Sequence, residues 1–453
     1  MKLTGTLAEF IVSTPAERIG LDARLQARRA MLDTVGVMLA GSTEECSRIA
    51  AQFVRDQAGA GDAVVVGQRL RAPASEAALV NGTSAHALDF DDVNMSMRGH
   101  PSVPLVPAVL ALGEKLGATG REVVDAFVVG FEVECKIGRL IGAPHYALGW
   151  HPTSTFGTLG SAAACARLLR LDAEGTQSAL GIAASLASGA RKNFGSMTKP
   201  LHAGWAARNG VVAASLAQAG FTADAEALEG EAGYLCAASG GAEFDPSPIE
   251  RLGEPWEVVS PGIGVKLYPC CYFTHLAVDS ALDVGQAIAN DVETVDAVHV
   301  SVSPGTMMVL RKTLPATGLE GKFSMEYCVA TALLDGAVTL ESFSDEAVAR
   351  TAIQDLLAKV AVTEDGPPAN APIGGRAEVT IVLRDGSSRS AHADVPRGDP
   401  KNPLSWDQIA AKFRDCARSV LDSGRTEETI DLTGHLDELP SIRDLTKTLE
   451  GGD

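Results

Sequence analysis

Helical patterns follow one another through the first half of this chain, and this run most constrains the fold that the chain can adopt. Apolar residues recur every three or four positions in residues 15–40, which is the spacing of one face of a helix. Further helical patterns cover residues 103–116, 119–141 and 201–219. Because no strand pattern alternates with these helices, the sequence predicts a large all-helical domain rather than a parallel α/β fold.

The pattern changes near residue 265. A period-two alternation of apolar and polar residues, typical of half-buried strands, is found in residues 298–302, 359–363, 377–383 and 390–395. Asp385-Gly386 lies between the last two segments and is a common turn of a β-hairpin. We therefore expect a mainly α fold, in which a smaller α+β domain is inserted into the helical domain.

The predicted domain boundaries follow from this change of pattern. Residues 1–265 form the first part of the helical domain, residues 266–399 form the α+β domain, and residues 400–453 return to the helical domain. Ser405 and Gln408 mark this return as a capping box, a motif that satisfies free backbone N–H groups at the start of a helix.

The composition restricts the classes of partner. Apolar residues make up 46% of the chain and charged residues 21%, which is compatible with a substantial core. The net charge of −19 argues against nucleic acid and against an anionic membrane as partners, because both attract a basic face. A small anionic substrate would need a local positive pocket to overcome this overall negative field.

We expect a cytoplasmic protein with reduced thiols. The chain has no run of about 18 apolar residues that would span a membrane, and residues 1–12 lack the layout of a signal peptide. The eight cysteines form no Cys-x-x-Cys pair. Cys270 and Cys271 are adjacent, and we expect both to pack as small hydrophobic residues, with a nucleophilic thiol as the alternative.

Residues 86–102 collect ionisable side chains in one short segment between two helical patterns. Asp89, Asp91 and Asp92 are flanked by apolar residues, and a buried carboxylate needs a partner. One interpretation is a divalent metal site made by these three aspartates and His100. Because the spacing fits no standard metal-site pattern, we predict that the chain uses no metal and no cofactor.

Three positions share one local pattern, an ionisable residue directly before a proline that opens a helix. They are His100-Pro101, His151-Pro152 and Lys199-Pro200. Proline suits the first turn of a helix and keeps the preceding residue extended, so we expect each basic group just outside a helix N-terminus. Such helix ends attract anions, and three together would form a pocket for a polycarboxylate. The same field would lower the pKa of a lysine or histidine and keep a neutral base available near pH 7.

Six motifs resemble the signature of the MmgE/PrpD family and occur in the family's order over nearly the whole chain. They are NGTSAHALDFDD (81–92), GHPS (99–102), GWHPT (149–153), TKPLHAG (198–204), KLYPC (266–270) and KFSMEY (322–327). The family includes 2-methylcitrate dehydratase, cis-aconitate decarboxylase and iminodisuccinate epimerase. The resemblance implies that the smaller α+β domain is a lid and that the protein is a homodimer.

The resemblance also implies an active site. Residues suited to acid–base chemistry stand at the active-site positions of cis-aconitate decarboxylase, namely Asp89, His100, His151, Lys199 and Tyr327. Two positions differ from that enzyme, since Val93 stands where it has a threonine and Cys271 where it has a histidine. As further substrate-binding residues we expect Arg191, Lys266, Cys271 and His202.

The reactions of this family share a proton transfer at a carbon next to a carboxylate. We hypothesise that Lys199 or His151 removes the proton and that His100 or Tyr327 acts as the acid. We expect Asp89 to orient a histidine and His202 to be a partner of Lys199. Cationic side chains aimed at the substrate carboxylates would stabilise the negative charge that develops on their oxygens.

The sequence therefore predicts a metal-independent lyase of the dehydratase type that acts on a small di- or tricarboxylate. The alternatives are an epimerase of a dicarboxylate such as iminodisuccinate, a decarboxylase of the cis-aconitate type, and an inactive family member that binds carboxylates. The sequence leaves open the exact substrate, the choice among these reactions, and which residue is the base and which the acid.

Overall fold

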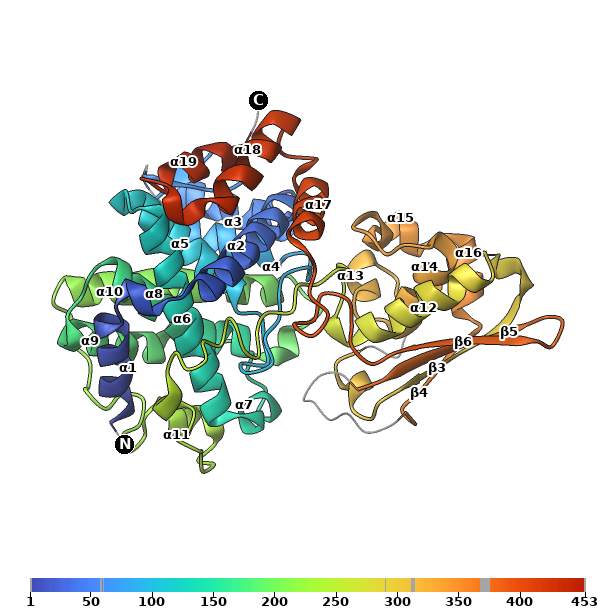
Figure 1. Ribbon diagram of the computed structural model, residues 1–453, viewed down its shortest axis with the longest axis horizontal. Helices are drawn as coiled ribbons and strands as arrows, with labels where there is room; N and C mark the ends of the chain where they lie inside the picture. Colours follow the sequence, from blue (N-terminus) through green and yellow to red (C-terminus); the bar gives the residue numbers. More distant parts are fainter. Residues whose placement is uncertain are drawn as a thin grey trace. The chain divides into compact units, whose positions relative to one another are not determined.

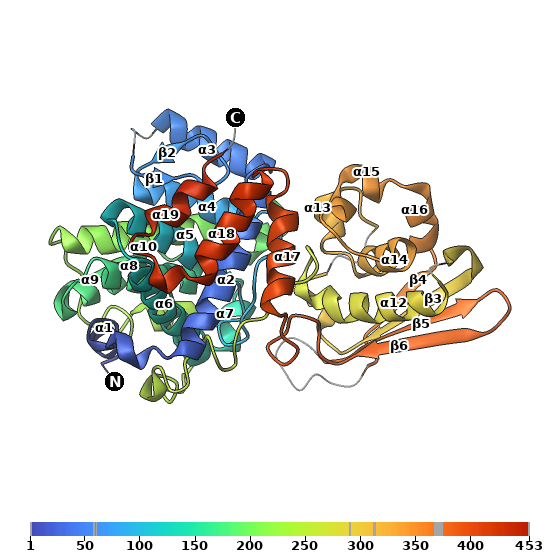
Figure 2. The same ribbon diagram turned by 45° about the horizontal axis from the view of Figure 1, so that its top comes forward.

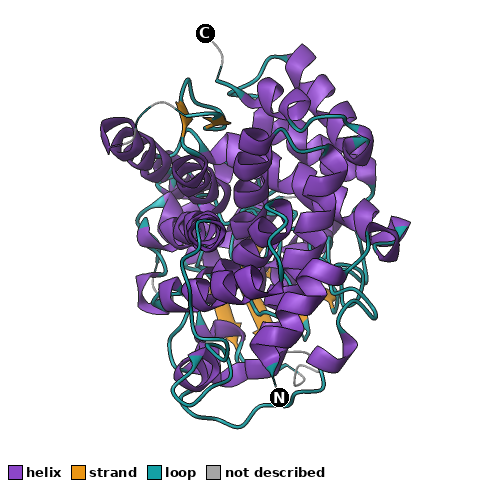
Figure 3. Ribbon diagram, turned by 90° about the vertical axis from the view of Figure 1, so that its left-hand side faces the viewer, coloured by secondary structure: helices purple, strands orange, loops and turns teal. Residues whose placement is uncertain are grey.

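The computed structural model describes residues 2–57, 59, 61–289, 291–310, 314–366 and 375–451. The chain forms two compact units: unit 1 comprises Met1–Val265 and Ser405–Asp453, and unit 2 comprises Lys266–Leu404. Unit 1 is mainly helical and unit 2 combines helices with a four-stranded sheet, which confirms the predicted mainly α fold class (Figure 1, Figure 3). We propose that the two units are the two domains expected from the sequence.

Unit 1 is built from long helices joined by short connections. They are α1 (Leu3–Ser13), α2 (Leu21–Gly41), α3 (Glu45–Gln57), α4 (Ala74–His86), α5 (Ser102–Leu116), α6 (Gly120–Ile141), α8 (Pro152–Leu168), α9 (Ala173–Leu186) and α10 (Thr198–Gln218). Shorter elements are α7 (Ala143–Ala147), α11 (Tyr234–Ser239) and the antiparallel pair β1 (Ala63–Val64) and β2 (Arg71–Ala72). Within the described residues, no helix is both long and apolar enough to cross a membrane.

The C-terminal segment returns to unit 1 as three helices. They are α17 (Trp406–Ala417), α18 (Ser423–Gly434) and α19 (Arg443–Thr446), and α17 packs on α2 (Figure 2). The predicted capping box is present at the start of α17, where Ser405 and Gln408 bond each other's backbone N–H groups. The N- and C-terminal parts of the chain therefore share one helical core.

Glycines bring α4 and α10 into close contact. A Cβ atom added at Gly82 of α4 would lie 2.8 Å from the Cα atom of Gly204 in α10, closer than real Cβ atoms approach other atoms. The two helices can therefore pack at this distance only because these positions lack side chains. Since the acidic segment follows α4 and Lys199 lies in the first turn of α10, this contact determines how the candidate site is assembled.

The prolines open helices as predicted, with one difference in detail. His151 is the N-cap residue of α8, with Pro152 at its first position, and His100 precedes α5 by two residues. α10 instead begins at Thr198, so Lys199 lies in its first turn. The expectation that Lys199 lies outside a helix N-terminus was wrong, because α10 starts one residue before this lysine.

The sheet of unit 2 has the order β4-β3-β5-β6. Its strands are β3 (Val295–Val302), β4 (Val360–Thr363), β5 (Ala377–Leu383) and β6 (Ser388–Ala393). β4 is parallel to β3, the other neighbours are antiparallel, and Asp385-Gly386 lies in the predicted hairpin turn between β5 and β6. Alternate residues of β3 are buried, as the period-two pattern predicts.

Helices complete unit 2. They are α12 (His275–Ala287), α13 (Gly318–Gly321), α14 (Met325–Asp335), α15 (Asp345–Val348) and α16 (Thr351–Leu357). Apolar side chains of α12, α14 and α16 form one core with those of the sheet. α15 and α16 are separate helices, because Arg350 between them has a ψ of 128°, outside the helical range.

Candidate active site

Asp89 and Lys199 form a buried ion pair in unit 1. The Nζ atom of Lys199 donates a hydrogen bond to Oδ1 of Asp89 at 2.5 Å, and each side chain is only 7% exposed. Asp89 has a φ of 53°, a left-handed conformation that costs a non-glycine residue free energy and often marks a functional site. The expected histidine contact of Asp89 is with Nε2 of His100 at 3.9 Å, and its shorter contact is with Lys199.

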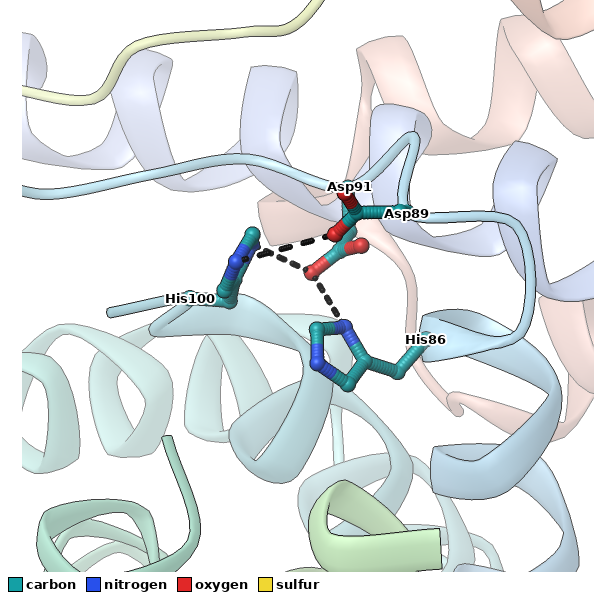
Figure 4. Close-up of side chains that lie close together, drawn as sticks. All are labelled: His86, Asp89, Asp91 and His100. Atoms are coloured by element: carbon teal, nitrogen blue, oxygen red, sulfur yellow. Dashed lines mark hydrogen bonds and ion pairs between the residues drawn. The ribbon is translucent and has the colours of Figure 1, made fainter. Parts of the chain in front are cut away.

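Asp91 lies between two imidazoles (Figure 4). Its Oδ2 atom is 2.9 Å from Nδ1 of His86 and 2.9 Å from Nδ1 of His100. Burial alone would raise the pKa of Asp91, but the charges and hydrogen bonds of His100 and His86 outweigh burial and hold this pKa well below its usual value. At neutral pH the Asp91 side chain is therefore a carboxylate that accepts from both rings.

The contacts of His100 fix its tautomer. Nδ1 of His100 lies 2.9 Å from the carboxylate of Asp91 and 2.9 Å from the backbone carbonyl oxygen of Asp92. Both oxygens only accept hydrogen bonds, so Nδ1 carries the proton. When His100 is neutral, Nε2 is therefore unprotonated, and this atom is on the side of the ring nearer Asp89.

His151 is held by aromatic rings and by a second histidine. Its Nδ1 atom is 3.0 Å from Nδ1 of His202, its ring stacks on His86, and the ring of Phe194 meets it edge-on. Burial, with the nearby charge of Lys199, holds the pKa of His151 well below 6.5, so His151 is neutral at pH 7. His202, the expected partner of Lys199, has a hydrogen bond with His151, and burial together with the charge of Lys199 lowers the pKa of His202 to about 4.

Arg191 has a hydrogen-bond donor without a partner. Its guanidinium lies over the ring of Tyr146, 3.9 Å from the centroid, and its Nη1 atom is buried with no hydrogen-bond partner among the described residues. The backbone joins Arg191 to the His151 segment, because Trp150 and Ala190 form a β-bridge. A buried guanidinium donor of this kind suits a carboxylate ligand.

The remaining predicted residues belong to unit 2. Tyr327 lies in the first turn of α14, and its hydroxyl donates to the backbone carbonyl of Ser342. Burial raises the pKa of Tyr327 to about 12. Lys266 is 1% exposed, and Cys271 is buried with its backbone N–H donating to Lys322 at 2.9 Å. Unit 1 thus brings together five of the predicted residues, which are Asp89, His100, His151, Lys199 and His202, and the backbone of Arg191 lies beside the His151 segment.

Four side chains also have the spacing of a metal site. Single ligand atoms of His86, Asp89, Asp91 and His100 all lie within 4.8 Å of one another (Figure 4). Lys199 already pairs with the charge of Asp89, and the rings of His86 and His100 already donate hydrogen bonds to Asp91. These contacts favour a proton-transfer site over a cation site.

Asp92, which was part of the metal interpretation, is not in this group of four. Its carboxyl group bonds the hydroxyl and the backbone N–H of Ser102 at the start of α5. Burial raises the pKa of Asp92 to about 8, so the group is mostly protonated at pH 7.

Sequence reasoning missed three residues of this cluster. Asp91 was named only in the metal interpretation, and neither His86 nor Phe194 was proposed as a site residue. His86 ends α4 inside the same motif as Asp89 and Asp91, so an unassigned histidine in an acidic segment was the available signal. Phe194 had no such signal, because its contacts with His151 and Lys199 arise only from the fold.

Comparisons with known proteins agree along the whole chain. Residues 5–247 match the model of the MmgE/PrpD N-terminal domain, and residues 268–438 match the MmgE/PrpD C-terminal domain. Cis-aconitate decarboxylase of Homo sapiens is 31% identical over 444 residues, which cover 94% of this chain and 90% of that protein. The Mus musculus protein of this name is 30% identical, covering 94% and 89%. One from Aspergillus terreus is 29% identical, covering 99% and 96%.

Proposed function

The chain belongs to the MmgE/PrpD family, and on this premise we propose that it is a metal-independent lyase of the dehydratase type that acts on a small di- or tricarboxylate. The common step is removal of a proton from a carbon next to a carboxylate. The observation that carries the proposal is the cluster of Lys199, His100 and His151 around two buried aspartates. It supplies a cation, an acid and a neutral base within one buried site.

The contacts suggest a division of roles. His151 is the base, because its lowered pKa leaves it unprotonated at neutral pH. His100 is the acid, because Asp91 holds Nδ1 and leaves Nε2, on the side of the ring nearer Asp89, to deliver the proton. Lys199 and Arg191 bind the substrate carboxylates, and their positive charge stabilises the negative charge that forms on the carboxylate oxygens.

Dehydration uses these roles in one sequence. His151 takes the proton next to a carboxylate, the electron pair of that bond forms a carbon–carbon double bond, and the carbon–oxygen bond breaks. His100 gives its Nε2 proton to the departing hydroxyl, which leaves as water. Tyr327 is less suited to this step, since its hydroxyl already donates to Ser342 and burial raises its pKa to about 12.

Decarboxylation of cis-aconitate is a second candidate, because the relatives compared above carry that name. In that reaction a carbon–carbon bond breaks to release carbon dioxide, and the acid protonates carbon instead of oxygen. Val93 and Cys271, which differ from the decarboxylase pattern, favour the first candidate. The side chain of Val93 has no polar atom to offer a substrate, and its backbone pairs with Gly264.

The test is incubation of the protein with a panel of carboxylates in deuterated water, followed by NMR. The panel contains 2-methylcitrate, citrate, cis-aconitate and iminodisuccinate. We expect deuterium at the carbon next to a carboxylate and an unsaturated product, whereas loss of carbon dioxide would favour the decarboxylase and inversion without other change an epimerase. Thermal stabilisation by a carboxylate with neither product nor exchange would overturn the proposal in favour of an inactive binding protein. Activity should survive chelation.

A further inference from the structure

We propose that Asp91 is a positioning residue whose negative charge holds His100 ready to act as the acid, while His86 holds Asp91 in place. This inference rests on the proposed function, since it assigns a role to the group that supports the proposed acid. Neither the family comparison nor the sequence motifs assign a role to Asp91 or His86. The inference comes from the arrangement of these side chains in the fold.

The first step is the geometry of the carboxylate. One oxygen of Asp91 is 2.9 Å from a ring nitrogen of His100 and 2.9 Å from a ring nitrogen of His86 (Figure 4). The other oxygen, Oδ1, is buried and has no hydrogen-bond partner among the described residues. Asp91 thus directs all its hydrogen bonding at the two imidazoles, which is the arrangement of a carboxylate that orients a catalytic histidine.

The second step is the difference between the two histidines. The ring of His86 is fully buried, and burial lowers its pKa to about 4, so His86 stays neutral and donates from Nδ1 to Asp91. His100 is more accessible, with 13% of its side chain exposed. When His100 takes a proton, the positive charge forms next to Asp91, whereas His86 contributes only a neutral hydrogen bond. The charge of Asp91 therefore acts on His100.

The negative charge of Asp91 can be removed while its hydrogen bonds with His86 and His100 are kept. In Asp91→Asn, the amide oxygen can occupy the place of Oδ2 and accept from both rings. The amide nitrogen then replaces Oδ1, which has no partner to lose among the described residues. The variant therefore tests the charge of Asp91 separately from its shape.

The experiment follows the ring nitrogens of His100 by NMR in protein labelled with nitrogen-15, as the pH is varied and without substrate. In the wild type we expect Nδ1 to stay protonated throughout and Nε2 to titrate. In Asp91→Asn we expect the midpoint of the Nε2 titration to move to lower pH by about one unit or more, because an adjacent opposite charge is lost. The ionisable groups around His100 are Asp89, Asp91, His86, His151 and Lys199.

Asp92→Asn is the matched control. Asp92 is as buried as Asp91 and adjacent to it, but burial raises its pKa to about 8, so at pH 7 its carboxyl group is mostly neutral already. It contacts His100 only through its backbone carbonyl, which the substitution keeps. The His100 titration should therefore stay within about 0.3 pH units of the wild type, since almost no charge is removed.

Steady-state kinetics give the second readout, with the substrate that the carboxylate panel identifies. Asp91→Asn should lower kcat about 100-fold with KM within about threefold, because general acid catalysis contributes this much and substrate binding is unchanged. The alkaline limb of the pH profile should move to lower pH by the same amount as the His100 titration. A fall in kcat with an unchanged profile would mean a structural role and overturn the inference.

The inference and the proposed function fail in different ways. If no carboxylate is turned over by the wild type, the proposed function fails, but the NMR titration still tests Asp91. If Asp91→Asn does not fold, the wild-type spectrum still tests the inference. A neutral His100 that carries its proton on Nε2 would contradict the predicted tautomer and overturn the inference. If Asp91→Asn folds and the midpoint of the His100 Nε2 titration is unchanged, the inference is overturned, even where the wild type turns over a carboxylate.

Discussion

Unit 1 and unit 2 both bury side chains that were predicted for the site, but they give them different partners. In unit 1, Asp89 pairs with Lys199, and Asp91 bonds two imidazoles. In unit 2, the hydroxyl of Tyr327 donates to a backbone carbonyl. Lys322, in the same family motif as Tyr327, donates from Nζ to the carbonyl of Pro269 at 2.9 Å.

This difference separates groups that can exchange protons from groups that hold the fold. When an imidazole takes up a proton beside a carboxylate, the new charge is balanced locally, so the proton can come and go at low cost. A hydroxyl bonded to a backbone carbonyl has no such balance, because the carbonyl does not change charge. We therefore expect the chemistry to depend on unit 1 side chains, and Tyr327 to stabilise unit 2.

Lys199→Met should have the largest effect. The change removes the cation that we assign to a substrate carboxylate and breaks its buried ion pair with Asp89. We expect kcat/KM to fall about 1000-fold or more, and the free energy of unfolding to fall by about 3 kcal/mol. Steady-state kinetics and urea unfolding measure the two effects.

The control for this change is Lys115→Met, which alters an exposed lysine at the end of α5. It should leave both quantities near the wild-type values. The double variant Lys199→Met with Asp89→Asn should recover stability without recovering activity, because it removes the carboxylate charge of the broken ion pair but not the need for a cation. Recovery of activity in the double variant would contradict the role of Lys199.

His151→Gln should have the next largest effect. Glutamine keeps a polar side chain beside His202 but cannot take up a proton, so we expect kcat to fall about 100-fold while the substrate still binds. NMR detection of deuterium exchange measures the proton-removal step directly. His145→Gln is the matched control, because His145 is also a buried histidine with a pKa lowered by burial to about 4, but it bonds Ala238 and Thr155. If His145→Gln lost as much deuterium exchange as His151→Gln, the assignment of His151 as the base would be contradicted.

Local sequence patterns predicted much of the fold. The capping box of Ser405 and Gln408 starts α17, and the Asp385-Gly386 turn joins β5 to β6, because these signals act within a few residues. The period-two pattern predicted β3 for the same reason. A helix boundary was missed at α10, which was expected over residues 201–219 and begins at Thr198.

The partners in the site were harder to predict. Asp89 and Lys199 are 110 positions apart, and their contact depends on how closely α4 and α10 approach at Gly82 and Gly204. Sequence spacing contains no such information, so the ion pair between Asp89 and Lys199 was not predicted. The residue types of the site were nevertheless predictable, because the family motifs name them. What the motifs lack is the pairing, and the pairing is what distinguishes Asp91 from Asp92.

Asp92→Asn should have little effect on activity and should change the pH dependence of stability. Burial raises the pKa of Asp92 from 3.8 to about 8, so the folded chain keeps a proton that the unfolded chain releases near pH 4. This contribution to stability is complete below pH 4 and is lost as pH rises to about 8. The asparagine cannot lose a proton. The wild type should therefore lose up to about 1.4 kcal/mol per pH unit relative to the variant between pH 4 and 8.

Urea unfolding of both proteins across this pH range measures the difference. Activity at pH 7 should stay close to that of the wild type, since the group is already mostly neutral there. Parallel stability curves for the two proteins would show that Asp92 is ionised in the folded state. That result would place a second negative charge beside Asp91. The role of Asp91 depends on its being charged while Asp92 is neutral, so this role would be weakened.

Tyr327→Phe should have the smallest effect on activity. The substitution removes the hydrogen bond to Ser342, so we expect the free energy of unfolding to fall by about 1–2 kcal/mol and kcat to stay within about threefold. Tyr272→Phe is the control in the same unit, since its hydroxyl bonds Asp399 at 3.1 Å and burial raises its pKa as well. A 100-fold fall in kcat for Tyr327→Phe alone would break the comparison, because it would require a hydroxyl bonded to a backbone carbonyl to deliver the proton assigned to His100.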